Sequence, residues 1–211
     1  HTFIGIYTAD QVDLIVGITG ILCARCVFVP LDPQLPVNRI KTMVRHSGIR
    51  LILTDEKGRE TLDSIPMDNG EPVTVESLEN AVATPASLEE LKRRVPQPHD
   101  PVYVYFTSGT SGVPRAVLGQ NKSLHHLVCW EIETLGIAPG TRVSQLAAPG
   151  FDAFLRDMFV PLCSGGIVCI PDLPAGLPDG QRLVHWLDSR LLQVVHCVPA
   201  IFRIILAGIL S

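Results

Sequence analysis

Small hydroxyl residues and glycines gather in the stretch YFTSGTSGVPRAV, residues 105–117. They fill every position from Thr107 to Gly112, and a single cation, Arg115, follows. The backbone N–H groups of such a turn form a nest for phosphate oxygens, because glycine lets the backbone approach closely. Arg115 can add a bidentate, charge-assisted contact. The residues therefore predict a phosphate-binding loop, and an ordinary flexible loop is the alternative.

Two familiar phosphate-loop spacings do not fit this stretch. The Walker A pattern G-x-x-x-x-G-K-[ST] needs a lysine after its second glycine. Gly109 and Gly112 are only three positions apart, and no lysine follows them. The G-x-G-x-x-G spacing of dinucleotide-binding folds fails as well. A phosphate loop of another class is required.

The elements that must position this loop alternate between apolar strands and amphipathic helices. A capping-box pattern, T-x-x-Q from Thr8, predicts the start of the first helix. We expect further helices from Pro36 to Gly48, over 121–136, 152–162 and 180–190, and from Pro199. We expect strands over 3–7, 27–31, 51–55, 102–106, 142–148, 166–171 and 193–198.

This alternation indicates an α/β fold with mostly parallel sheets flanked by helices, because continuous apolar strands are typical of sheets covered on both faces. Residues 1–57 are expected to form a first α/β unit. Residues 58–100 are rich in Pro, Glu, Asn and Ser and are read as a variable connector. Residues 101–211 form the second α/β unit, which carries the phosphate loop.

Composition excludes several classes of protein. The 211 residues carry a net charge of -4 without a basic stripe, which argues against nucleic-acid binding. Arg25 interrupts the longest apolar region and Pro30 closes it, so we expect no membrane span. The six cysteines lie in apolar segments, as reduced thiols of a cytoplasmic protein do. The CARC spacing lacks a second ligand pair, so no metal site is expected.

Three ordered stretches resemble adenylate-forming enzymes. YVYFTSGTSGVPRAV resembles their glycine-rich ATP-pyrophosphate loop, and residues 20–55 are similar to their early core segment with its VPLDP-type strand end. GFDAFLRDMFVPLCSGG, residues 150–166, is similar to the FD segment that opens the amino-acid pocket of non-ribosomal peptide synthetases. The chain is thus identified as part of the N-terminal core of an adenylation domain.

The resemblance implies a two-step ligase reaction with ATP and Mg²⁺. A substrate carboxylate attacks the α-phosphate, and the acyl group then passes to the phosphopantetheine thiol of a carrier protein. The amino acid, the carrier protein and neighbouring synthetase domains are the implied partners, in cytoplasmic secondary-metabolite biosynthesis. Thr107 and Arg115 would assist catalysis. The nucleotide would be bound by Thr107, Ser108, Gly109, Thr110, Ser111, Gly112 and Arg115.

The resemblance also implies a substrate pocket. Asp152 would pair with the substrate α-ammonium, and its alternative role is a helix N-cap. Ala153 and Arg156 would line the pocket, and Phe151 would flank it. Arg156 lies four residues after Asp152, so an i, i+4 ion pair is the alternative for its side chain. If Arg156 instead points into the pocket, an acidic or polar substrate side chain is expected.

Two features leave other functions open. Arg115 and Ala116 stand where the family usually has Lys and Gly, which puts loop mobility and catalytic rate in doubt. The family's downstream segments, including the catalytic lysine of its C-terminal lid, are not in this sequence. One alternative is therefore a truncated, non-catalytic segment that acts as a scaffold in a synthetase. The other is an acyl-CoA or aryl-acid ligase, which shares the loop and has no need of Asp152.

Overall fold

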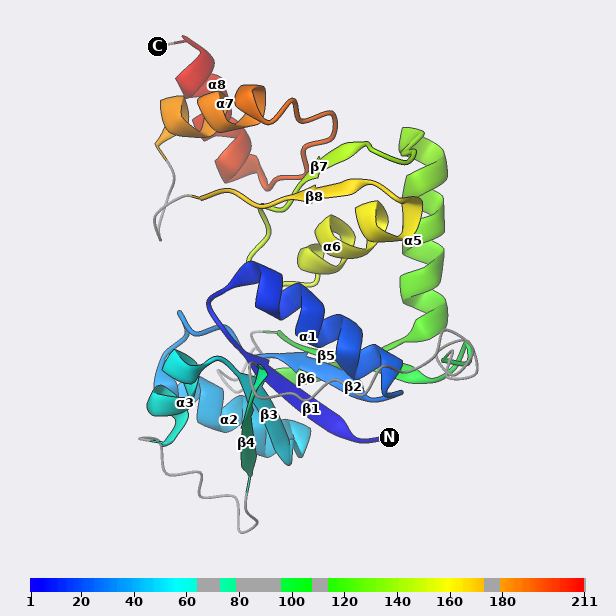
Figure 1. Cartoon of the computed structure of the whole chain (residues 1–211), viewed down its shortest axis with the longest axis vertical. Coiled ribbons are helices and arrows are strands. Elements are labelled where there is room, and N and C mark those ends of the chain that lie inside the picture. Colours follow the sequence, from blue (N-terminus) through cyan, green and yellow to red (C-terminus); the bar gives the residue numbers. More distant parts are fainter. Residues whose placement is uncertain (64–72, 79–95, 108–113, 173–178, 211) are drawn as a thin grey trace. The chain divides into compact units, whose positions relative to one another are not determined.

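The computed structural model describes residues 1–63, 73–78, 96–107, 114–172 and 179–210 (Figure 1). The chain divides into two compact units, His1–Leu124 and His125–Ser211. The division falls within helix α5 (Asn121–Leu135). In this division, which differs from the predicted one, the phosphate loop belongs to the first unit and the predicted substrate pocket to the second. Each is described within its own unit.

The first unit is built on a six-stranded sheet in the order β4-β3-β1-β2-β5-β6. Its strands are β1 (Phe3–Tyr7), β2 (Val27–Pro30), β3 (Leu51–Thr54), β4 (Thr74–Ser77), β5 (Pro101–Thr107) and β6 (Arg115–Gln120). All pairings are parallel except β5 with β6. The central β2 is buried along its whole length, as expected for a strand covered on both faces. The predicted α/β fold with a mostly parallel sheet is confirmed.

Helix α1 (Gln11–Cys23) lies on one face of this sheet, and α2 (Val37–Ser47) and α3 (Glu56–Asp63) lie on the other (Figure 1). Opposite faces follow from right-handed crossovers, because the chain steps from β1 to β2 in one direction and from β2 to β3 in the other. Both α3 and β4 fall within residues 58–100 or at their edge, the segment read as a connector. That reading stays a prediction.

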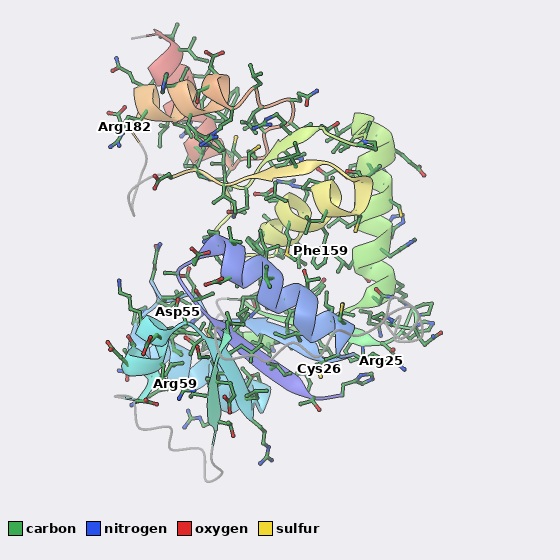
Figure 2. All side chains as sticks on the ribbon, viewed as in Figure 1. Arg25, Cys26, Asp55, Arg59, Phe159 and Arg182 are labelled. Atoms are coloured by element: carbon green, nitrogen blue, oxygen red, sulfur yellow. The ribbon has the colours of Figure 1, made fainter. Side chains whose placement is uncertain are left out.

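The first helix starts at a different cap from the predicted one. Asp10 is the N-cap of α1, and its carboxylate accepts hydrogen bonds from the backbone N–H groups of Val12 (2.8 Å) and Asp13 (3.0 Å). The Thr8 hydroxyl instead donates to Asp55 at 2.6 Å. Asp55, which is labelled in Figure 2, also accepts from the backbone N–H of Gly58 in the first turn of α3. The hydroxyl that we predicted as a cap therefore ties β1 to the start of α3.

The second unit is built around two parallel strands, β7 (Arg142–Ser144) and β8 (Ile167–Cys169). Helix α6 (Ala153–Ser164) lies on one side of them, and α7 (Gly180–Ser189) and α8 (Pro199–Leu210) lie on the other (Figure 1). Cys169, Leu183, Trp186 and Ile205 form the buried core between β8 and this pair of helices. Gly165 ends α6 at φ 74°, a left-handed conformation that glycine adopts without strain.

The strand predicted over residues 193–198 is wrong. This segment makes one isolated parallel bridge, between Val143 and Val194, and then enters α8 at Pro199. The bridge nevertheless fixes the register of the segment against β7. Within the parts of the chain that the structure describes, no helix has both the length and the apolar character needed to cross a membrane.

Candidate functional site

The base of the predicted phosphate loop is a rung of the β5–β6 hairpin. Thr107 ends β5, Arg115 begins β6, and the two residues are direct cross-strand partners. Both are exposed. Residues Ser108, Gly109, Thr110, Ser111 and Gly112 lie outside the described residues. The two ends of the loop thus bring a hydroxyl and a cation to one place, which fits a nucleotide phosphate chemically.

The second unit contains a cavity of about 430 Å³ at the start of α6. This volume lies in the range of small-molecule sites in proteins. Its lining includes all four predicted substrate-binding residues, Phe151, Asp152, Ala153 and Arg156. Two residues that sequence reasoning did not single out, His196 and Cys197, line it as well. Most of the other lining residues are apolar.

Asp152 lies at the N-cap position of α6, but its side chain makes no capping hydrogen bond. Its backbone is already helical, with φ -63° and ψ -25°, whereas a capping residue usually has an extended backbone. The carboxylate is exposed, and no hydrogen bond or ion pair joins it to any described residue. It is therefore free to meet a cation that enters the cavity.

The ion pair between Asp152 and Arg156, which we considered from their spacing, is not formed. The Arg156 guanidinium instead approaches two buried carboxylates, with Nε 3.7 Å from Glu131 Oε1 and 3.8 Å from Asp157 Oδ1. The Arg156 side chain is 33% exposed, against 6% for Glu131 and 0% for Asp157. Arg156 therefore spans the distance between the cavity and a buried acidic pair.

His196 lies between the same two carboxylates. Its Nδ1 is 3.2 Å from Asp157 Oδ1, and its Nε2 is 2.7 Å from Glu131 Oε1. The second approach is a close contact without hydrogen-bond alignment. Asp157 is fixed further, because its Oδ2 accepts from the backbone N–H groups of Leu146 (3.0 Å) and Ala147 (2.9 Å). We call Glu131, Arg156, Asp157 and His196 the charged cluster.

The main chain sets the position of His196. Its backbone N–H donates to the Ser144 hydroxyl at 3.1 Å, directly after the bridge between Val143 and Val194. The Ser144 backbone N–H donates to the Val194 carbonyl at 3.0 Å. These bonds fix the backbone at His196, and the ring is held by its own contact with Asp157.

Cys197, the next residue along the cavity wall, has an altered acidity. Burial raises the pKa of its thiol, the Arg156 cation lowers it, and the Asp157 carboxylate raises it. Burial is the largest of these effects, because a low-dielectric environment disfavours the thiolate. The thiol therefore remains protonated at a pH where an exposed cysteine begins to ionise.

Sequence reasoning missed three members of the charged cluster, although two of them, Glu131 and Asp157, carried a signal. Glu131 stands between Trp130 and Ile132, and Asp157 stands within the run FLRDMF. An acidic residue on the apolar face of a helix is expected to have a buried partner. The two carboxylates come from different helices, however, so their meeting at His196 required the fold.

The chain matches a known protein family. The family model described as AMP-binding enzyme matches residues 1–210. Nonribosomal peptide synthetase 32 of Fusarium pseudograminearum is 30% identical over 98% of the chain, which covers 2% of that protein. The chain spans only 2 to 5% of the length of the first curated relatives that it matches.

Two peptide synthetases are among the solved structures of similar fold. The crystal structure of the nonribosomal peptide synthetase FmoA3 (S1046A) matches with a TM-score of 0.84 at 22% identity, over 100% of this chain and 21% of that one. The four-domain synthetase holo-AB3403, bound to AMP and glycine, matches with a TM-score of 0.81 at 23% identity, over 98% and 15%. At these identities the likeness is one of fold.

Proposed function

Because the chain belongs to the AMP-binding enzyme family, we propose that it forms part of a domain that activates an amino acid in a multidomain peptide synthetase. One observation favours an amino acid over other carboxylic acids as the substrate. The Asp152 carboxylate lines a mostly apolar cavity and has neither a capping role nor an ion-pair partner among the described residues. An α-ammonium group is the cation that distinguishes an amino acid from a fatty or aryl acid.

The proposed reaction begins with the amino acid held at Asp152. Its carboxylate attacks the α-phosphorus of ATP, and pyrophosphate leaves as the aminoacyl-adenylate forms. Negative charge grows on the pyrophosphate, so preorganised donors at that place lower the barrier. Thr107, Arg115 and the intervening residues Ser108, Gly109, Thr110, Ser111 and Gly112 are the proposed donors. Mg²⁺ on the phosphates would add further charge neutralisation.

The second step would transfer the aminoacyl group to a carrier protein. The phosphopantetheine thiol loses its proton and attacks the acyl carbonyl, and AMP leaves. The AMP and glycine held by the synthetase holo-AB3403 support these ligand classes. A carrier protein and neighbouring synthetase domains are accordingly the proposed partners, and the cytoplasm is the proposed compartment.

The test is ATP–pyrophosphate exchange by the full-length protein with a panel of amino acids. Asp152→Ala is expected to lower kcat/KM for the preferred amino acid roughly 100-fold, because the substrate ammonium loses its counter-charge. Asp188→Ala, which removes an exposed carboxylate on α7, is the matched control and should leave exchange unchanged. Undiminished exchange in the Asp152 variant contradicts the pocket assignment.

The same assay separates the two alternatives. Turnover of a fatty or aryl acid with CoA, and none with amino acids, would identify an acyl or aryl ligase. No exchange with any acid, from a folded full-length protein, would leave the scaffold role.

A further inference from the structure

The charged cluster sets the charge that the described residues around Arg156 present to a substrate side chain. Glu131 and Asp157 contribute two negative charges, and Arg156 contributes one positive charge. The imidazole of His196 adds a positive charge or none. In either protonation state of His196 the summed charge of the cluster is zero or negative. The positive charge of Arg156 is therefore already neutralised by Glu131 and Asp157.

Burial strengthens the electrostatic interactions of these charges with an approaching substrate. The side chains of Glu131, Asp157 and His196 are at most 9% exposed, so water screens their charges poorly. An anionic side chain that approached Arg156 would also approach these two carboxylates. The attraction to one cation would be offset by repulsion from two anions held within 4 Å of the same guanidinium nitrogen.

Arg156 still has hydrogen-bond donors to offer. Its contacts with Glu131 and Asp157 involve Nε, at distances beyond a hydrogen bond, and the guanidinium makes no hydrogen bond to any described residue. The side chain is one third exposed and lines the cavity. Its terminal N–H groups can therefore bind an acceptor that brings no charge.

We infer that the cavity selects an amino acid with an uncharged, hydrogen-bond-accepting side chain, such as a carboxamide, and that Glu131 is the positioning residue that excludes carboxylates. The inference rests on the proposed function, because it names the substrate class of the same pocket. Glu131 acts through Arg156 and does not line the cavity. It holds the guanidinium in place and cancels its charge.

Paired substrates test this selection. The full-length protein is assayed by ATP–pyrophosphate exchange with glutamine against glutamate and with asparagine against aspartate. Each pair differs little in shape and by one charge. We expect kcat/KM for the amide to exceed that for the acid at least tenfold in one of the two pairs. Higher exchange with the acids overturns the inference.

Glu131→Gln tests the positioning role. The variant keeps the size of the side chain and removes one negative charge beside Arg156, so the cluster can become positive. The amide-to-acid ratio should fall at least tenfold. Glu133→Gln removes an exposed charge from the same helix and is the matched control, with an unchanged ratio expected. A ratio does not depend on the folded fraction, so partial unfolding does not produce this result.

Arg156→Met provides a second measure if Glu131→Gln does not fold. This variant should lose exchange with the amide while the apolar amino acid methionine or leucine becomes the better substrate. Equal ratios in the Glu131 and Glu133 variants, or a wild-type protein that prefers apolar amino acids, would refute the inference. Failure of every amino acid in the wild-type protein would refute the proposed function instead.

Discussion

Asp157 is the most constrained charge among the residues described in the second unit. It is fully buried, accepts two backbone N–H groups, and faces both Arg156 and His196. Asp157→Asn should lower the free energy of unfolding by about 3 kcal/mol, because loss of a buried partner leaves uncompensated charges and donors. Chemical denaturation measures the change. The exposed Asp152→Asn should shift it by less than about 0.5 kcal/mol, and equal effects at both positions would contradict the burial argument.

The reactivity of the Cys197 thiol reports on the environment of the cavity. Its pKa is raised chiefly by burial, so less thiolate is present at neutral pH than in a free thiol. Alkylation by iodoacetamide at pH 7.5 should therefore be slower at Cys197 than in glutathione and should accelerate as the pH rises through the raised pKa. Peptide mass spectrometry locates the adduct. Because the Arg156 cation lowers this pKa, Arg156→Met should slow the reaction further, and a faster reaction would show that another group controls the thiol.

Single residues of the pocket were visible in the sequence when a motif carried them. Phe151, Asp152, Ala153 and Arg156 lie in one short stretch, and the structure brings all four to one cavity. Their roles toward a substrate stay predictions. Glu131 and His196 belong to segments 65 residues apart in the chain and meet only through the fold. Spacing along a sequence does not reveal such a contact.

At the scale of elements, Gly119 in β6 tests how closely the antiparallel hairpin is packed. A Cβ at this position would overlap the ring of Tyr103, which packs edge-on against Tyr105 with ring centroids 5.5 Å apart. Gly119→Ala should lower the free energy of unfolding by about 1 to 3 kcal/mol through overpacking. Gly20→Ala in α1 meets open space and should raise it by up to about 1 kcal/mol. A neutral Gly119 variant in urea denaturation would mean that the tyrosine ring moves aside easily.

Strand β6 was missed although it is apolar in sequence, because its residues Ala116, Val117 and Leu118 are not buried. β6 is exposed over its first four residues, Arg115–Leu118, and so shows no buried face. The strands of the parallel sheet were found because burial on both faces makes them continuously apolar. The strand wrongly expected over 193–198 is apolar as well, but β7 is only three residues long and offers it a single bridge. Two of its valines, Val195 and Val198, are exposed, so apolar character predicted neither burial nor pairing there.

At the scale of the whole molecule, the number of free thiols can be predicted and counted. All six are free, including both members of the CARC pair, Cys23 and Cys26. The unfolded chain should therefore accept six alkyl groups without prior reduction, and the thermal midpoint should not change when a reductant is added. Intact mass spectrometry counts the adducts. Four adducts without reductant and six with it would reveal a disulfide that the structure does not contain.

The fold class was predictable because strands and helices alternate regularly along the chain. Apolar strands alternate with helices that carry one apolar face, and right-handed crossovers leave few ways to order them. The substrate class was not predictable on that basis. It depends on the sum of charges around Arg156, and that sum includes Glu131 from a helix that no pocket motif contains.

At position 196 the backbone and the side chain have separate roles: main-chain bonds hold the chain, and the side chain contributes to the charge of the cavity. The Ser144 hydroxyl holds the backbone N–H there, whatever side chain the residue carries. A different residue at this position would alter the electrical balance of the cavity and leave the path of the chain unchanged. Redesign of substrate preference can therefore begin at this wall position, with a replacement that still satisfies the two buried carboxylates.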